Sequence, residues 1–512
     1  MNIRQVINLL CLLLLALAAV MVLNGAIAGF WMWRGAIGER AAMEAMLAAA
    51  IIGAVVGGAG WLATRGPSRV LGPREALLLV ALSWLIGAVL AALPMWLWAI
   101  FAGDAAAGHE LRRFIDCYFE ATSGLTTTGA TILTDIEALP KSIILWRSIT
   151  HWLGGLGIVV LFVAVLPSLG VGGKKLFRVE TPGPSPGGVR PHIRDTARIL
   201  WLIYVGMTLV FITALRLGGM TWFDAICYTF SGISTGGLAP HNASVGEYNS
   251  ALLDVMIIIM MVLAGVSFRI YYDVIRGQWQ RAWRDTELRV YLILKIVIVA
   301  IVAALIFGMT IETSAGEEID GTAGQSLRFA GFTVIAMHTG TGYVTADYDQ
   351  WPILAKMLIV GLMFIGGSAG STAGGIKVVR FWMGLKIITA ELERVFRPNV
   401  IRPLKVGTGT IDTDLKLTTM VFLVSFAVLW GIGAFLLMLF EPRELCDPVT
   451  AMTASVATLA NVGPGMAAVG PVSNYEWFTP QSKVVMSLLM ILGRLEMFTI
   501  LILLTPRFWR GN

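Results

Sequence analysis

Four short stretches, each rich in threonine, serine or glycine, are the residues of this chain whose types and spacing could do chemistry. Each stretch ends in a glycine and follows an apolar segment of roughly half the length needed to cross a bilayer, which is about 20 residues. Backbone carbonyls arranged as a ring can replace the hydration shell of a monovalent cation, and glycine permits the backbone angles that such a ring requires. We predict a potassium-type filter made of Thr127, Thr128, Gly129, Ser234, Thr235, Gly236, Gly340, Thr341, Gly342, Asn461, Val462 and Gly463.

The spacing of the four stretches indicates an internal repeat. Their closing glycines, Gly129, Gly236, Gly342 and Gly463, are 107, 106 and 121 residues apart, and a repeat at such a period determines the architecture. A plain turn between helices would explain one such stretch, but four at near-regular spacing favour a repeated unit. We therefore predict an all-α integral membrane protein. Four pseudo-repeated helix–pore loop–helix units surround one pore, and an N-terminal helix pair stands outside the repeat.

The composition also favours a membrane protein. Of 512 residues, 57% are hydrophobic and only 14% are charged, which is less charge than a soluble domain carries. The first apolar run resembles a signal peptide around Ala26–Ala28 but is longer than a usual signal core, so we expect a retained spanning helix. The predicted organisation is a transmembrane helix pair at residues 1–70, followed by pore repeats at 71–180, 181–284, 285–405 and 406–512. Together these segments predict ten spanning helices and four half-helices.

Apolar runs and capping residues predict the elements that must position the filter. The inner helices of repeats two and four are expected to be continuous over Leu252–Tyr272 and Val484–Leu504. Asp447 followed by Pro448 fits an N-cap with proline at the first helical position, and Asp224 is expected to cap its half-helix in the same way. The four half-helices are predicted at Phe114–Leu125, Trp222–Ile233, Ser326–Met337 and Pro448–Leu459.

The distribution of charge between loops predicts the orientation. The loops that connect the repeats are basic, whereas the opposite side carries mainly acidic residues between Glu312 and Asp349. The positive-inside rule then places both termini and the basic loops in the cytoplasm. An acidic outer mouth would concentrate cations, although ordinary solvated loops explain the same residues. The basic residues are Lys174, Lys175, Arg178, Arg190, Arg194, Arg198, Arg276, Arg281, Arg284, Arg289, Lys377, Arg380, Lys386, Arg394, Arg397, Arg402 and Lys405.

A glycine-rich segment interrupts the inner helix of repeat three, which starts near Ile353. Non-helical backbone at membrane depth is tolerated only against protein or a watery cavity, so we predict a flexible plug below the filter. A phosphate-binding loop is excluded because the order G-x-x-x-x-G-K-[ST] and a preceding strand are missing. A helix-packing glycine cluster stays open. The predicted gate residues are Gly366, Gly367, Ser368, Gly370, Ser371, Thr372, Gly374, Gly375, Lys377 and Arg494.

Arg494 is a charge inside the last apolar segment, and such charges usually face an interior cavity. It could form an electrostatic barrier beneath the filter, or one half of a structural ion pair between helices. Glu496 is two residues away and therefore does not share its helix face. Arg269 is predicted to reach the cytoplasmic surface, and His338 is predicted to pack behind the filter rather than to bind an ion.

Two further functions compete with a channel-like pore. A proton- or sodium-coupled symporter would need a titratable relay, for which the sequence offers Asp254, Glu496 and His151. A membrane redox enzyme would need paired histidines, and five dispersed histidines argue against it. The cysteines show no metal-ligand spacing, so we expect no enzyme activity and no cofactor on this chain. These cysteines are Cys11, Cys117, Cys227 and Cys446.

At its filter and gate the chain resembles the TrkH family, the potassium-translocating subunits of the bacterial Trk system within the Trk/Ktr/HKT superfamily. The resemblance covers nearly the whole chain and is specific at Thr126–Thr131, Gly366–Lys377, Asn461–Gly465 and Gly493–Glu496. It implies a pseudo-fourfold potassium pore in the bacterial inner membrane, obstructed by the glycine-rich loop and by Arg494. Plant relatives that prefer sodium have serine at the first filter glycine, so the resemblance associates Gly129 with potassium.

The resemblance also implies partners. They are a second copy of the chain, in a homodimer, and a cytoplasmic ring of TrkA-like subunits that bind the regulatory nucleotide. The nucleotide is expected on the partner because this chain has no G-x-G-x-x-G in a strand-turn-helix context. The basic loops Lys174–Arg198 and Lys377–Lys405 are the expected docking surface.

Overall fold

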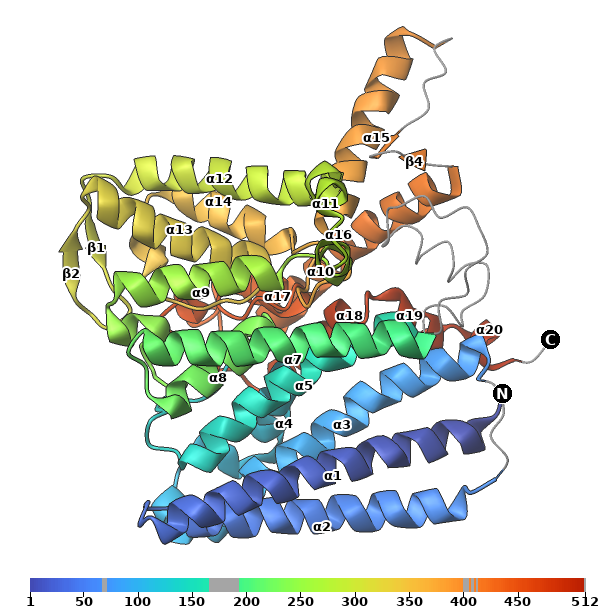
Figure 1. Ribbon diagram of the computed structural model, residues 1–512, viewed down its shortest axis with the longest axis vertical. Helices are drawn as coiled ribbons and strands as arrows, with labels where there is room; N and C mark the ends of the chain where they lie inside the picture. Colours follow the sequence, from blue (N-terminus) through green and yellow to red (C-terminus); the bar gives the residue numbers. More distant parts are fainter. Residues whose placement is uncertain (67–70, 165–192, 399–404, 407–408, 411–412, 511–512) are drawn as a thin grey trace.

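The computed structural model describes residues 1–66, 71–164, 193–398, 405–406, 409–410 and 413–510. The long helices lie roughly side by side, and both chain termini are at one end of the bundle (Figure 1). The short hairpin of β1 (Thr310–Glu312) and β2 (Glu318–Asp320) lies at the opposite end. Residues 165–192 contain most of the basic loop predicted after repeat one, so that prediction lies outside the described residues.

The N-terminal helix pair packs closely because one helix carries a stripe of small residues. α1 (Ile3–Trp33) and α2 (Glu39–Ala63) are neighbours in the bundle. Ala42, Ala45 and Ala49 recur on the buried side of α2, and small residues at this spacing let helix backbones approach each other in a membrane. A Cβ atom built at Gly57 would lie 3.0 Å from the Cys11 carbonyl oxygen, so a larger side chain there would separate the pair.

Four units of similar organisation follow, each with an outer helix, a half-helix and an inner segment. The outer helices are α3 (Pro73–Phe101), α7 (Ile193–Leu217), α12 (Thr286–Ile306) and α16 (Thr413–Phe440). The half-helices are α4 (Phe114–Leu125), α8 (Trp222–Ile233), α13 (Ala323–Thr339) and α17 (Pro448–Leu459). The inner segments are α5 (Lys141–Ala164), α9 (Ala251–Ala264) with α10 (Phe268–Ile275), α14 (Ile353–Phe364) with α15 (Val378–Phe396), and α18 (Pro480–Arg494) with α19 (Phe498–Leu501).

Short elements complete the described chain. They are α11 (Trp279–Arg284), α20 (Pro506–Trp509) and the paired strands β3 (Lys405–Val406) and β4 (Gly409–Thr410). The 3₁₀ helices are η1 (Gly103–Ala106), η2 (Glu110–Arg112), η4 (Ser244–Tyr248), η5 (Tyr348–Gln350), η6 (Ala467–Val469) and η7 (Ile502–Leu504). Among the described residues, six helices are long and apolar enough to cross a membrane, or up to eight if each bent pair is one span. The prediction of ten also counted α5, whose side chains are described only to Gly157, and the interrupted segment α14–α15.

The predicted continuity of two inner helices is wrong. α9 and α10 are bent by 94° and α18 and α19 by 110°, each at a short break. The second break is forced by the backbone, because Glu496 and Met497 both adopt positive φ angles of 55° and 54°, which no α-helix accommodates. Hydropathy continues across both breaks, so an apolar run alone could not reveal them.

In three of the four units, a side chain caps the start of the half-helix. Asp447 accepts a hydrogen bond from Thr450 N at 2.8 Å with Pro448 at the first helical position, which confirms the prediction for α17. For α8 the prediction was one turn off, because Thr221 is the cap and accepts from Asp224 N. Thr322 caps α13, which therefore begins at Ala323 rather than at Ser326. The predicted bounds of α4, α8 and α17 are confirmed.

Candidate ion filter and gate

The four half-helices end in one repeated local geometry. The first or second residue after each half-helix adopts a left-handed conformation, with φ of 53° at Thr127, 56° at Thr235, 73° at Gly340 and 56° at Asn461. The next residue donates its N–H to a carbonyl five residues earlier, at 2.8–2.9 Å, which closes the helix in a left-handed cap. These bonds join Thr128 to Ser123, Gly236 to Ser231, Thr341 to Ala336 and Val462 to Ala457.

This geometry changes the register of the second stretch. Its equivalent residues are Thr235, Gly236 and Gly237, because Thr235 takes the left-handed position and Gly237 has the positive φ of the closing glycine, 87°. Ser234 instead ends α8, and its hydroxyl donates to the carbonyls of Phe230 and Ser231. Gly237 is thus a site residue that sequence reasoning missed. Gly237 is the fourth residue after the predicted helix end at Ile233, as Gly129 and Gly463 are after theirs, so counting from the helix ends would have found it.

The four stretches converge and close a ring. A Cβ atom built on each closing glycine would collide with the middle carbonyl oxygen of the next stretch, so the backbones are in direct contact. The distances are 2.2 Å from Gly129 to Gly236, 2.0 Å from Gly237 to Thr341, 2.0 Å from Gly342 to Val462, and 2.7 Å from Gly463 to Thr128. Each quarter therefore touches the following one in chain order, and the fourth returns to the first.

The oxygen atoms that the ring offers to an ion are uncharged. The filter stretches contain no charged residue, and the C-terminal ends of the half-helices carry partial negative charge toward it. Asn461 joins the fourth quarter to the first, because its Nδ2 donates to Thr128 Oγ1 and to the Met490 carbonyl, both at 2.9 Å. Such a ring is suited to a dehydrated monovalent cation.

Two buried ion pairs join the first half-helix to neighbouring helices, and the sequence did not predict either pairing. Glu120 of α4 binds Arg147 of α5 at 2.7 Å. Asp116, also on α4, binds Lys483 of α18 at 2.6 Å. The first pair joins consecutive helices 27 positions apart, and the second spans 367 positions, so neither follows from the spacing within one helix.

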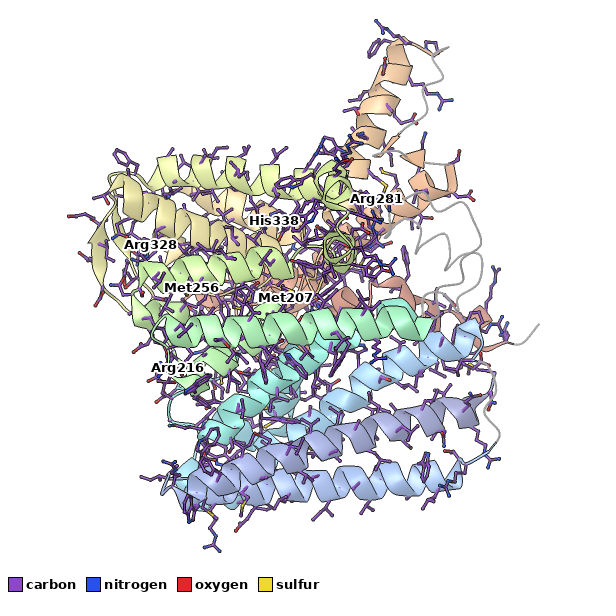
Figure 2. All side chains as sticks on the ribbon, in the orientation of Figure 1. Met207, Arg216, Met256, Arg281, Arg328 and His338 are labelled. Atoms are coloured by element: carbon purple, nitrogen blue, oxygen red, sulfur yellow. The ribbon has the colours of Figure 1, made fainter. Side chains whose placement is uncertain are left out.

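The environment of His338 differs from the prediction of simple packing. Lys295 of α12 lies 3.0 Å from His338 Nδ1, and its ammonium is 4.0 Å from the Tyr291 ring centre. Figure 2 shows Arg328 near the end of α13 that faces the β-hairpin and His338 deeper along the same helix. His338 therefore connects the third half-helix to its outer helix just before the filter.

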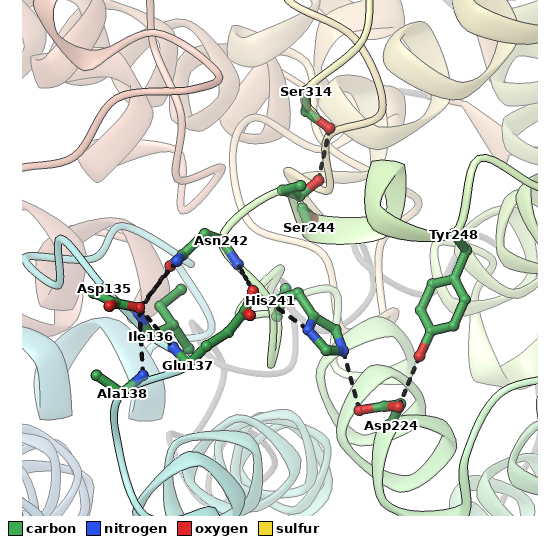
Figure 3. A network of polar contacts seen from close by, with 12 residues as sticks. Asp135, Ile136, Glu137, Ala138, Asp224, His241, Asn242, Ser244, Tyr248 and Ser314 are labelled. Carbon is green, nitrogen blue, oxygen red and sulfur yellow. Dashed lines mark hydrogen bonds and ion pairs between the residues drawn. The ribbon is translucent and has the colours of Figure 1, made fainter. Parts of the chain in front are cut away.

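A polar network links the loops that follow the first two filter stretches (Figure 3). Asn242 Nδ2 donates to Asp135 at 3.1 Å, and the Asn242 N–H donates to Glu137 at 3.2 Å. His241 lies between Glu137, at 3.5 Å, and Asp224, at 3.3 Å. The pKa of His241 is raised above its ordinary value by its hydrogen bond to Asp224, while burial acts in the opposite direction and the nearby carboxylates add to the rise.

The glycine-rich segment forms a closed, buried loop against the ends of the half-helices. Ile365 and Ile376 pair at its base. Thr372 near its tip donates to the Ile233 carbonyl at 3.0 Å, and a Cβ atom on Gly374 would lie 2.4 Å from the Ala460 carbonyl. Lys377 closes the loop from inside, because its Nζ donates to the Ala373 carbonyl. The loop is therefore non-helical and packs against the ends of the half-helices.

Arg494 contacts the loop directly. Its guanidinium donates to the Thr372 carbonyl at 2.7 Å and to the Gly154 carbonyl at 3.4 Å, so backbone oxygens hold it. Glu496 pairs instead with Arg380 of α15 at 2.7 Å. The two charges thus have separate partners, as their spacing predicted.

The residues considered for a proton or sodium relay are not brought together. Asp254 pairs with Arg328 at 2.6 Å, Glu496 pairs with Arg380, and His151 lies behind the ring, where a Cβ atom on Gly236 would be 2.1 Å from its Nδ1. Arg269 lies near Asp273 and Asp285 at 3.8 and 3.7 Å. Within the described residues, no group of three or more histidine, cysteine, aspartate or glutamate side chains could hold a metal ion.

Comparisons with known proteins agree with this arrangement. Residues 42–510 match the TrkH family, which is described as a cation transport protein. The chain is 35% identical to the Trk system potassium uptake protein TrkH of Salmonella typhimurium and 34% identical to that of Escherichia coli K12, over 100% of each chain. Its fold is similar to the crystal structure of the potassium transporter TrkH from Vibrio parahaemolyticus, with a TM-score of 0.86, 29% identity and full coverage of both chains.

Proposed function

The chain belongs to the TrkH family of cation transport proteins, and we propose that it takes up potassium through a gated, channel-like pore. It is a multi-pass protein of the bacterial inner membrane and a transporter rather than an enzyme. The closed ring of four filter stretches carries the proposal, since a contact from each quarter to the next is what a single ion site on a shared axis needs. The full-length relatives named as potassium uptake proteins support the choice of ion.

Selection would take place at the ring. A potassium ion would exchange its water for carbonyl oxygens of the four stretches, with Gly237 completing the second. The contacts of 2.0–2.7 Å that a Cβ atom would make leave no room for side chains at the closing glycines. The membrane potential would drive entry by about 2.3 kcal/mol per charge per 100 mV.

Control would take place at the loop below. Thr372, near the tip of the loop, bonds to the end of α8 and accepts from Arg494, so loop and arginine together obstruct the path in this conformation. Conduction then requires both to move. We assign the closed state of the gate to these contacts.

Regulation would come from the cytoplasmic side. We propose that both termini are cytoplasmic, that the protein is a homodimer, and that a TrkA-like subunit carries the nucleotide, with no cofactor on this chain. α15 extends away from the bundle at the end that holds the termini (Figure 1). It carries the exposed Arg394 of the predicted docking surface, and the exposed Arg397 follows it as the C-cap residue.

Ion flux into proteoliposomes tests the proposal. The protein should take up radioactive rubidium, an analogue of potassium, without an imposed pH gradient. Gly129→Ser places a Cβ atom 2.2 Å from the Gly236 carbonyl oxygen, so it should displace that oxygen, lower rubidium uptake and let sodium compete. Uptake that depends on a proton or sodium gradient would instead favour a coupled symporter. No flux from folded protein, even after deletion of residues 368–374, would overturn the pore.

A further inference from the structure

Glu287 is a buried carboxylate with no role in the filter. It lies in the first turn of α12 and is 5% exposed. Its Oε1 accepts the N–H of Ala369 at 2.7 Å and the N–H of Val379 at 3.3 Å. A carboxylate in such surroundings is costly unless its hydrogen bonds are kept, so these contacts are a strong constraint.

The two donors belong to different parts of the gate. Ala369 is in the obstructing loop, and Val379 is in the first turn of α15. The N–H groups of a first helical turn have no partner within the helix, and a negative charge there is favoured by the helix dipole. Lys377, the N-cap residue of α15, makes no side-chain cap. Glu287 therefore caps α15 from a neighbouring helix while the same oxygen holds the loop.

A second contact ties the base of α15 to the other obstructing element. Arg380, the residue after Val379, binds Glu496 at 2.7 Å, and Glu496 follows the Arg494 that holds Thr372. A displacement of α15 would thus act on the loop through Glu287 and on Arg494 through Glu496. Figure 1 shows α15 reaching out of the bundle, where a force could be applied to it.

We propose that Glu287 is a positioning residue of the gate, which holds the obstructing loop to the base of α15 and keeps the pore closed until α15 moves. This inference rests on the proposed pore function. It does not require Glu287 to contact the ion. It requires only a hydrogen-bond acceptor at this position.

Two variants of the full chain show whether the hydrogen-bond acceptor of Glu287, rather than its charge or its side-chain volume, keeps the gate closed. Glu287→Gln keeps a carbonyl oxygen that can accept both N–H groups, whereas Glu287→Leu keeps the bulk and removes the acceptor. In proteoliposomes that lack the partner subunit, the leucine variant should raise the ratio of open to closed protein about tenfold, which corresponds to about 1.4 kcal/mol. The readout is the rubidium leak per amount of folded protein. The glutamine variant should stay within about twofold of wild type.

A chemical readout reports the loop itself. Ser368 is fully buried, and its hydroxyl has no hydrogen-bond partner among the residues that the structure describes, so Ser368→Cys is a nearly isosteric change. The four native cysteines are buried. A thiol reagent should modify Ser368→Cys about tenfold faster when Glu287→Leu is also present. A residue that only supported folding would lower the yield of folded protein without changing this rate.

The outcomes are decisive in each direction. Wild-type leak and wild-type modification rates in folded Glu287→Leu would overturn the proposal, and so would a glutamine variant as leaky as the leucine variant. If the leucine variant does not fold, Glu287→Asp, which withdraws the acceptor by one methylene, must show the rise instead. Deletion of residues 368–374 is the control for the pore: if it conducts and the Glu287 variants behave as wild type, only the tether fails.

Discussion

Replacing Gly237 with alanine tests the register of the ring, with Gly219 as its matched control. Both glycines have positive φ, 87° and 112°, so alanine at either position costs about 1–2 kcal/mol of backbone strain. A Cβ atom at Gly219 meets nothing within 4 Å, whereas at Gly237 it lies 2.0 Å from the Thr341 carbonyl oxygen. Ordinary contact begins at 3.4 Å, so this oxygen must retreat by about 1.4 Å.

A displacement of that size exceeds the roughly 0.5 Å within which a functional site must be held. We expect Gly237→Ala to lower rubidium uptake by at least about tenfold, or about 1.4 kcal/mol, with a matching loss of preference over sodium. Gly219→Ala should stay within about twofold of wild type. Uptake is measured in proteoliposomes and normalised to folded protein from size-exclusion chromatography.

A third variant separates the two possible registers. Ser234→Ala removes a hydroxyl that bonds only within α8 in the structure, so selectivity should not change. The reasoning is refuted if Gly237→Ala conducts and selects as wild type does, or if Gly219→Ala or Ser234→Ala is equally damaging.

Three further predictions concern the gate, the buried charges and the outer loops. Arg494→Ala should raise rubidium leak several-fold by removing the donor to Thr372, and loss of folded protein instead would assign the arginine a structural role. Lys483→Met should cost about 3–5 kcal/mol of stability in thermal unfolding because it leaves the Asp116 carboxylate buried without its cation; a melting temperature equal to that of wild type would contradict this. Because its pKa is raised in the folded state, His241 should stabilise the protein fully below about pH 6.5 and lose this contribution as pH rises through the raised pKa. His241→Gln should abolish that dependence of the melting temperature, and an unchanged profile would exclude His241 as its source.

The local parts of the site could be predicted because they depend on nearby residues. The bounds of α4, α8 and α17 and the cap by Asp447 follow from apolar runs and from side chains within one turn. Gly340 occupies the left-handed position that Thr127, Thr235 and Asn461 adopt with strain, so glycine suits it.

The rest depends on contacts that the order of residues does not show. No pattern near Glu287 in the sequence predicts its hydrogen bond with Ala369, and none near Lys295 predicts its contact with His338. The break after Arg494 is likewise hidden, because the apolar run continues on both sides of it and no nearby pattern shows that Glu496 pairs with Arg380. These features arise from packing between elements that are separated in the chain, both within and between repeats, and a single sequence does not encode them in a readable pattern.

The return of the fourth quarter to the first has a consequence for biogenesis. Asn461 bonds to Thr128 across 333 positions of the chain, and Lys483 to Asp116 across 367. Most of the polypeptide must therefore be inserted before the carboxylate of Asp116 can pair with Lys483. A nascent chain halted before the last repeat lacks both the fourth contact of the ring and the cation that neutralises Asp116.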